Sequence, residues 1–342
     1  MAANWKMTPA TEQEAKKKAL SFKNISKKYQ KLTKDQIGLE ILVCPPFPYL
    51  SALSQIFKNS QARVGAQDVS QFDGGSKTAE VGSTMIASIG ATYTIVGHSE
   101  RRAMGDTDEF VAIKLGQVIR TGMTGILCIG EKVRDPEGEY LNVIQAQIKA
   151  SLARMNNTDF AHLVIAYEPV WAIGSVDNVA LSGHELHQMI IYIRKVLREL
   201  YNDSIASSVR ILYGGSVHEG NVEDIIWNGE VDGLLIGRAS FDPKSYEAIC
   251  KAIISPQLEA HKIATRQKIR NIKKNIKASR ARMSHTPLRA QMQKAQKAKS
   301  KRKKSPMKSG AQTNQSKASI KGGIKKSSKN RSKSGSNKMK KR

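Results

Sequence analysis

The first 257 residues predict an α/β fold, a closed (β/α)8 barrel. Short, nearly all-apolar segments alternate with amphipathic helical patterns, which is typical of parallel strands buried on both faces of a sheet. Seven such segments and a stub at Ala2–Trp5 make eight β/α units, and about 255 residues is close to the ~250 that such a barrel needs. The alternative is a doubly wound open sheet, but no G-x-G-x-x-G turn follows a strand here.

The expected elements follow one another in a regular order. The strands after the stub are Ile37–Cys44, Ala62–Ala66, Tyr93–Gly97, Thr124–Ile129, His162–Tyr167, Val209–Tyr213 and Val231–Gly237. Helical patterns lie at 11–31, 47–57, 79–89, 107–121, 138–155, 179–202, 219–227 and 243–254. The stub is short, so we expect a truncated first strand whose neighbours keep unpaired edges. A start assigned downstream of the true one would explain it.

Charge divides the chain into two parts. Lys and Arg total 56, and 29 of them lie in residues 261–342, which contain no Asp or Glu. Residues 1–260 therefore carry 27 basic and 29 acidic residues, a net charge of −2. The first part has the composition of an ordinary globular domain that can bury a sizeable core.

The basic part predicts a helix and then a disordered tail. Ile269, Ile272 and Ile276 recur at helical spacing among Lys and Arg residues, which indicates a basic amphipathic helix over 258–284. Residues 285–342 are rich in Lys and Ser, so we expect them to be disordered. A charged tail of this kind favours nonspecific contact between 261–342 and a polyanion: RNA, DNA or an anionic membrane surface. The alternative is a solubilising tail without a dedicated partner.

Other features limit the compartment and the class of protein. Cys44, Cys128 and Cys250 lie far apart, without a partner at metal-ligand spacing, which favours a reducing cytoplasmic location over a disulfide or metal framework. No apolar run approaches the ~18 residues of a membrane span, so we expect no transmembrane segment. No signal-peptide pattern opens the sequence.

Polar residues and glycines gather just after the predicted strands, where a barrel carries its functional groups. They are Asn4 and Lys6; His98, Ser99 and Glu100; Cys128 and Glu131; Glu168; Gly214, Gly215 and Ser216; and Gly237. Glycine-rich turns leave backbone N–H groups free to bind a phosphate. Each residue alone has an ordinary structural alternative, such as a satisfied histidine or a tight turn, but their placement at one rim predicts a site.

The segment 166–174 combines a carboxylate with a stiff loop. Glu168 ends a buried strand, and Pro169 restricts its own backbone and that of the residue before it. The apolar segment 170–173 and Gly174 then predict a lid that docks over a ligand. The alternative is that Glu168 only caps the next element and that Trp171 belongs to the core.

These residues form motifs that resemble the triosephosphate isomerase family across residues 2–256. The most specific are His98-Ser99-Glu100-Arg101-Arg102 and Tyr167-Glu168-Pro169-Val170-Trp171-Ala172-Ile173-Gly174. The others are Ala3-Asn4-Trp5-Lys6-Met7, Ala66-Gln67-Asp68-Val69-Ser70, Cys128-Ile129-Gly130-Glu131, Tyr213-Gly214-Gly215-Ser216-Val217 and Gly233-Leu234-Leu235-Ile236-Gly237. Nothing in the family resembles the tail.

The resemblance implies a TIM barrel that interconverts dihydroxyacetone phosphate and glyceraldehyde 3-phosphate through an enediol, without a cofactor or metal. It implies that Glu168 is the base that moves the carbon-bound proton and that a neutral His98 polarises and protonates the carbonyl oxygens. Lys6 is then expected to place a positive charge beside the developing oxyanion. Asn4 is then expected to hydrogen-bond the substrate, and Glu100 to pair with Lys6. A purely structural Lys6–Glu100 ion pair is the alternative.

The resemblance also implies the groups that hold the substrate and the partner subunit. The phosphate is expected on the backbone of Gly174, Ser216, Gly237 and Arg238 and on the Ser216 hydroxyl. The lid comprises Pro169, Val170, Trp171, Ala172, Ile173, Gly174 and Ser175. Thr78 is expected to reach into the neighbouring subunit of a homodimer.

The sequence departs from the family pattern at three further places. Arg238 and Ala79 stand where the family commonly has glycine, and Ser175-Val176-Asp177 replaces the usual far hinge of the lid. We expect phosphate binding to survive if the backbone at residue 238 tolerates a side chain. A second function class, an inactive barrel that binds nucleic acid or other polyanions through its tail, remains as an alternative.

Overall fold

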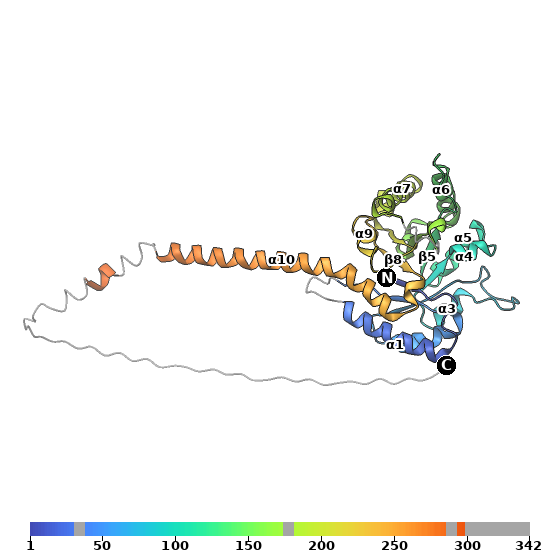
Figure 1. The fold of residues 1–342 in the computed structure, drawn as a ribbon, viewed down its shortest axis with the longest axis horizontal. Coiled ribbons are helices and arrows are strands. Elements are labelled where there is room, and N and C mark those ends of the chain that lie inside the picture. Colours follow the sequence, from blue (N-terminus) through green and yellow to red (C-terminus); the bar gives the residue numbers. More distant parts are fainter. Residues whose placement is uncertain (31–37, 174–180, 285–292, 298–342) are drawn as a thin grey trace, which may run out of the picture. The chain divides into compact units, whose positions relative to one another are not determined.

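A computed structural model describes residues 1–30, 38–173, 181–284 and 293–297, and it contains a closed barrel of eight parallel strands in sequence order (Figure 1). The strands are β1 (Ala2–Asn4), β2 (Leu42–Cys44), β3 (Arg63–Ala66), β4 (Tyr93–Val96), β5 (Thr124–Ile129), β6 (Leu163–Tyr167), β7 (Arg210–Tyr213) and β8 (Gly233–Ile236). The predicted (β/α)8 barrel is therefore confirmed, and the open-sheet alternative is excluded.

Helices cover the outside of the barrel between successive strands. The α-helices are α1 (Glu12–Tyr29), α2 (Leu50–Phe57), α3 (Ser83–Ser88), α4 (Ser99–Ala103), α5 (Asp108–Arg120), α6 (Glu139–Ser151), α7 (Gly183–Leu200), α8 (Asp203–Ser208), α9 (Val222–Trp227) and α10 (Pro243–Ser284). Short 3-10 helices are η1 (Phe47–Tyr49), η2 (Asn157–His162), η3 (Val170–Ala172) and η4 (Arg238–Ser240).

The core has two layers, one inside the barrel and one between the barrel and its helices. Inward-facing side chains fill the barrel, including Leu42, Ile95, Ile126 and Val164. The outer layer joins the strands to the helices in one large cluster. Because strand side chains alternate between the two layers, strands buried on both faces read as continuous apolar runs in the sequence.

The short first strand still closes the barrel, so the expectation of unpaired edges on its neighbours is wrong. Ala2 lies opposite Leu42 of β2 and Leu235 of β8, so β1 pairs on both sides. Near its start lies a cavity of about 310 Å³ lined by residues that include Met1 and Arg210. Arg210 Nη1 donates a hydrogen bond of 3.0 Å to Glu40, and the Tyr93 hydroxyl donates one of 2.9 Å to the same carboxylate.

The second strand is shorter than the sequence predicts. The expected strand spans 37–44, but β2 contains only Leu42–Cys44, and residue 37 lies outside the described residues. The chain before β2 packs against the end of α1, where the Leu39 N–H donates to the Tyr29 carbonyl at 2.7 Å. A side chain at Gly38 would overlap the Gln30 carbonyl, so this turn requires glycine.

One predicted helical pattern also begins later than expected, and a separate helix follows it. The pattern at 179–202 is α7 and begins only at Gly183, because Ser182 caps it in a box with Glu185. Asn202 then caps a separate helix, α8, through a bond from the Ile205 N–H to its side chain.

The last helix of the barrel and the expected basic helix form one element, α10, which continues through Pro256. The chain divides into two compact units, Met1–Arg270 and Asn271–Arg342. A domain boundary at residue 257 therefore stays a prediction. Of the tail expected to be disordered, the structure describes only 293–297, which are helical. Within the described ranges, we find no helix with the length and apolar content needed to cross a membrane.

Candidate active site

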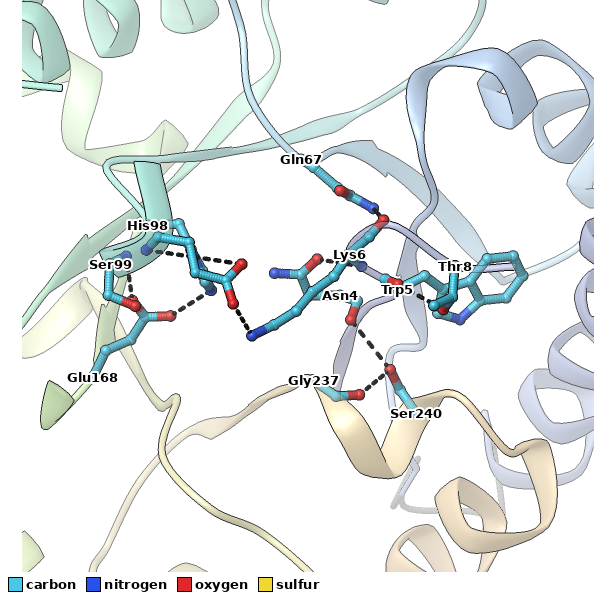
Figure 2. A network of polar contacts seen from close by, with 11 residues as sticks. Asn4, Trp5, Lys6, Thr8, Gln67, His98, Ser99, Glu168, Gly237 and Ser240 are labelled. Atoms are coloured by element: carbon cyan, nitrogen blue, oxygen red, sulfur yellow. Dashed lines mark hydrogen bonds and ion pairs between the residues drawn. The ribbon is translucent and has the colours of Figure 1, made fainter. Parts of the chain in front are cut away.

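Lys6 follows β1 in a backbone conformation that few side chains adopt. Its φ is 49°, in the left-handed region. Two contacts hold it there: its N–H donates to Asn4 Oδ1 at 3.0 Å, and its carbonyl accepts a bond of 2.8 Å from Gln67 Nε2 (Figure 2). Strain maintained by surrounding hydrogen bonds is typical of functional sites.

His98 follows β4 and caps the short helix α4. Its Nδ1 accepts the Glu100 N–H at 3.2 Å. A ring nitrogen that accepts a hydrogen bond carries no proton, so this geometry assigns the neutral tautomer with its proton on Nε2. Nε2 points to the Glu168 carboxylate, 3.3 Å away (Figure 2).

Glu168 is almost completely buried, with 2% of its surface exposed. It follows β6, where its own N–H donates to the Ile129 carbonyl at 2.8 Å. The Ser99 N–H donates to its Oε2 at 3.0 Å, which fixes the carboxylate beside the imidazole. Burial and the nearby Glu168 charge raise the pKa of the Cys128 thiol well above its usual value. This neighbouring thiol therefore stays protonated.

The Lys6 ammonium forms an ion pair with Glu100, with 2.5 Å between Lys6 Nζ and Glu100 Oε1. Figure 2 shows the Lys6 side chain extending past Asn4 toward the His98 side of the site. A Cβ at Gly237 would come within 3.3 Å of Lys6 Cε, so glycine there leaves room for the lysine.

A cavity of about 780 Å³ joins these groups to the turns after β7 and β8. Its lining contains Asn4, Lys6, His98, Glu100, Glu168, Gly214, Gly215, Ser216, Gly237 and Arg238. The backbone approaches the carboxylate closely, since a Cβ at Gly214 would lie 2.7 Å from Glu168 Cγ. The cavity thus combines a buried carboxylate, an imidazole, an ammonium group and glycine turns.

Arg238 fits the backbone at its position. It opens η4, and its φ does not fall in the positive region that favours glycine. Ser240 stabilises the turn after β8, because its hydroxyl donates to the Gly237 carbonyl at 2.7 Å. A side chain at residue 238 therefore leaves its own backbone unstrained.

The described part of the lid, Pro169–Ile173, is anchored at its first hinge. Val170–Ala172 form η3, and the Val170 N–H donates to the Glu131 carbonyl at 2.9 Å. Trp171 Nε1 donates to Glu131 Oε1 at 2.8 Å, and the Tyr167 hydroxyl donates to the same oxygen at 2.9 Å. Gly174, Ser175 and the far hinge lie outside the described residues.

The structure brings the five residues predicted to be catalytic into one cavity, together with Ser216, Gly237 and Arg238. Thr78 lies apart from this cavity, in a loop of which residues 73–80 are all exposed. Three residues that position the site received no role from the sequence: Gln67, Ser240 and Glu131. Gln67 and Glu131 do follow predicted strands, so their place in the chain was the available signal. Ser240 offered none.

Comparisons with known proteins identify the family. The family model for triosephosphate isomerase matches residues 1–253. The triosephosphate isomerase of Dechloromonas aromatica is 37% identical over 254 residues, which cover 74% of this chain and 97% of that protein. Those of Dictyoglomus thermophilum and Symbiobacterium thermophilum are 34% and 38% identical and are covered over 98% and 95% of their lengths. The chain belongs to the triosephosphate isomerase family.

Proposed function

We propose that the chain interconverts dihydroxyacetone phosphate and glyceraldehyde 3-phosphate in the 780 Å³ cavity, with Glu168, His98 and Lys6 as the catalytic residues. The observation that carries this assignment is the convergence of these three side chains, which come from β6, β4 and β1, beside the glycine turns after β7 and β8.

Glu168 acts as the base. Its carboxylate removes a proton from the hydroxymethyl carbon of dihydroxyacetone phosphate, and the electron pair of that C–H bond forms a carbon–carbon double bond. The carbonyl π electrons move to the oxygen, which gives an enediolate. Return of the proton to the neighbouring carbon and collapse of the other oxygen to a carbonyl give the aldehyde. The burial of Glu168 limits the exchange of this proton with water but does not abolish it.

His98 and Lys6 stabilise the charge that develops on oxygen. The Nε2–H of the neutral imidazole donates to the carbonyl oxygens and passes a proton between them. The Lys6 ammonium supplies a fixed positive charge, and Asn4 donates from its side-chain amide. Fixed donors of this type stabilise a transition state more than they stabilise a neutral carbonyl. Glu100 holds the Lys6 ammonium at the cavity edge.

The substrate phosphate binds to the opposite end of the cavity. The backbone N–H groups of Ser216, Gly237 and Arg238 and the Ser216 hydroxyl face it, and we assign a further N–H to Gly174 of the lid. Backbone dipoles supply much of the counter-charge that the phosphate needs. We assign no metal or cofactor to the reaction.

The lid protects the enediolate. An enediolate phosphate that meets water can eliminate its phosphate, so closure over the intermediate favours isomerisation. Closure of Pro169–Ser175 starts from the hinge at Glu131, where Trp171 and Tyr167 share one carboxylate oxygen.

A homodimer completes the proposed assembly, with Thr78 reaching toward the partner's site. The loop around Thr78 is exposed over 73–80, and Ala79 holds a φ of 72°, so the loop contains a strained turn that is open to a partner. Light scattering on the purified chain measures this state directly, and a monomer at all concentrations would contradict it. We also place the enzyme in the cytoplasm, because Cys44, Cys128 and Cys250 are free and buried, which suits a reducing compartment.

The alternative, an inactive barrel that works by binding nucleic acid, has weaker support. No aromatic residue follows Tyr246, so the basic part has no group on which a base could stack. The intact arrangement of Glu168, His98 and Lys6 has no purpose in such a protein.

A coupled isomerase assay on the full chain tests the proposal. His98→Gln should lower turnover by about 10²- to 10³-fold, as expected for loss of one donor to an oxyanion. The matched control is His162→Gln, since His162 is the exposed last residue of η2 and should not affect turnover. Equal turnover in the two variants, or no isomerase activity in the wild-type chain, would overturn the proposal.

A further inference from the structure

The isomerase site uses no residue beyond the start of α10, yet the second half of this helix has two distinct faces. Ile269, Ile272 and Ile276 are large apolar side chains with 47%, 57% and 49% of their surface exposed. Their spacing of three and four residues places them on one side of the helix. They form a solvent-exposed strip that we call the isoleucine stripe.

Cations occupy one flank of the helix. Arg270, Lys274 and Lys277 repeat at the same helical spacing and are all exposed. At ~100° per residue they lie about 80–140° around the helix from Ile269. Lys273 follows Ile269 by one turn and borders the stripe. Residues 261–342 contain 29 Lys and Arg residues and no Asp or Glu, so no acidic group in this part of the chain neutralises them.

We propose that the segment 269–277 of α10 lies on an anionic lipid surface, with the isoleucine stripe in the boundary between headgroups and acyl chains. A basic amphipathic helix binds such a surface by burying its apolar face while Lys and Arg contact acidic headgroups. Long lysine side chains such as Lys273 reach the headgroups while their stems stay beside the apolar face.

Two other occupants explain less of the surface. A nucleic acid would use the cations but would leave the three isoleucines in water, and the segment has no aromatic residue for stacking. A second copy of the helix would cover the isoleucines, but it would leave the cations without an anionic partner. An anionic bilayer satisfies both faces at once.

Flotation of the full chain with lipid vesicles tests this assignment. The wild-type chain should bind vesicles of phosphatidylcholine with one third phosphatidylserine, and should not bind phosphatidylcholine alone. The variant Ile269→Gln/Ile272→Gln/Ile276→Gln should bind these vesicles at least about tenfold more weakly than the wild type, because it keeps every cation but loses the apolar face. Higher salt should weaken binding of the wild-type chain.

A matched control removes three exposed apolar side chains elsewhere: Leu20→Gln/Val143→Gln/Ile191→Gln. It should bind vesicles like the wild type. Equal vesicle binding by the stripe variant and the wild type would show that charge alone acts, and would overturn the proposal. So would a chain that ignores both vesicles but retains a homopolymeric RNA, which would favour the nucleic acid. Isomerase turnover, measured on the same samples, should be equal in all three proteins.

Discussion

The close approach of Gly214 to the carboxylate gives a sharp test of how the site is positioned. A Cβ at residue 214 would lie 2.7 Å from Glu168 Cγ, whereas ordinary contacts begin at 3.4 Å. In Gly214→Ala the Glu168 side chain must therefore retreat by about 0.7 Å. A misplacement of ~1 Å costs about 10²-fold in rate, so we expect turnover to fall about tenfold to a hundredfold.

The assay is steady-state isomerisation by the full chain, with thermal unfolding recorded in parallel. The Michaelis constant should change little, because Gly214 is not among the residues that we assign to the phosphate. Gly116→Ala is the matched control: a Cβ there meets no atom within 4 Å. That change in α5 should leave turnover intact and raise the free energy of unfolding by about 0.5–1 kcal/mol. Turnover in Gly214→Ala equal to that of Gly116→Ala would refute the positioning argument.

Two further predictions concern stability. Lys114 is buried and contacts Asp68 at 3.0 Å and Asp106 at 2.6 Å, so Lys114→Met should lower the free energy of unfolding by about 3–5 kcal/mol in chemical denaturation. The exposed Lys16→Met should change it by less than about 1 kcal/mol, and equal effects would contradict the role of burial. Burial raises the pKa of Tyr213 to about 12, from 10.0. The folded chain therefore holds this proton more tightly than the unfolded chain, and the resulting stability is present below pH 10 and is lost as the pH rises toward 12. Tyr213→Phe should gain about 1 kcal/mol relative to the wild type between pH 9 and pH 11 in denaturant titrations; a constant difference would count against the prediction.

The sequence predicted the barrel well because its signals are local. Strands buried on both faces read as apolar runs, and β5 and β6 contain almost the residues expected. The second strand was predicted too long, because Leu39 pairs with the end of α1 and no local pattern reports that contact. The start of α7 was likewise set by a cap: the helix begins at Gly183, after Ser182, and not at the predicted 179.

The catalytic residues could be predicted because they follow predicted strands, but the contacts that hold them in position could not. Lys6 and Glu168 were identifiable because each follows a strand at the same rim. The left-handed conformation of Lys6 and the bond from Gln67 that holds it depend on residues 61 positions apart. The hydroxyl of Ser240, which bonds to Gly237, has no sequence signature either. Such contacts arise only after the barrel closes.

The most direct test of the catalytic assignment is exchange of the carbon-bound hydrogen of dihydroxyacetone phosphate with deuterated water. The wild-type chain should incorporate deuterium during isomerisation. In Glu168→Gln, exchange and isomerisation should fall together by about 10²- to 10⁴-fold, while a phosphate-bearing enediolate analogue still binds and the exposed Glu12→Gln behaves like the wild type. Exchange at the wild-type rate in Glu168→Gln would contradict the assignment, because the proton would then move through another group.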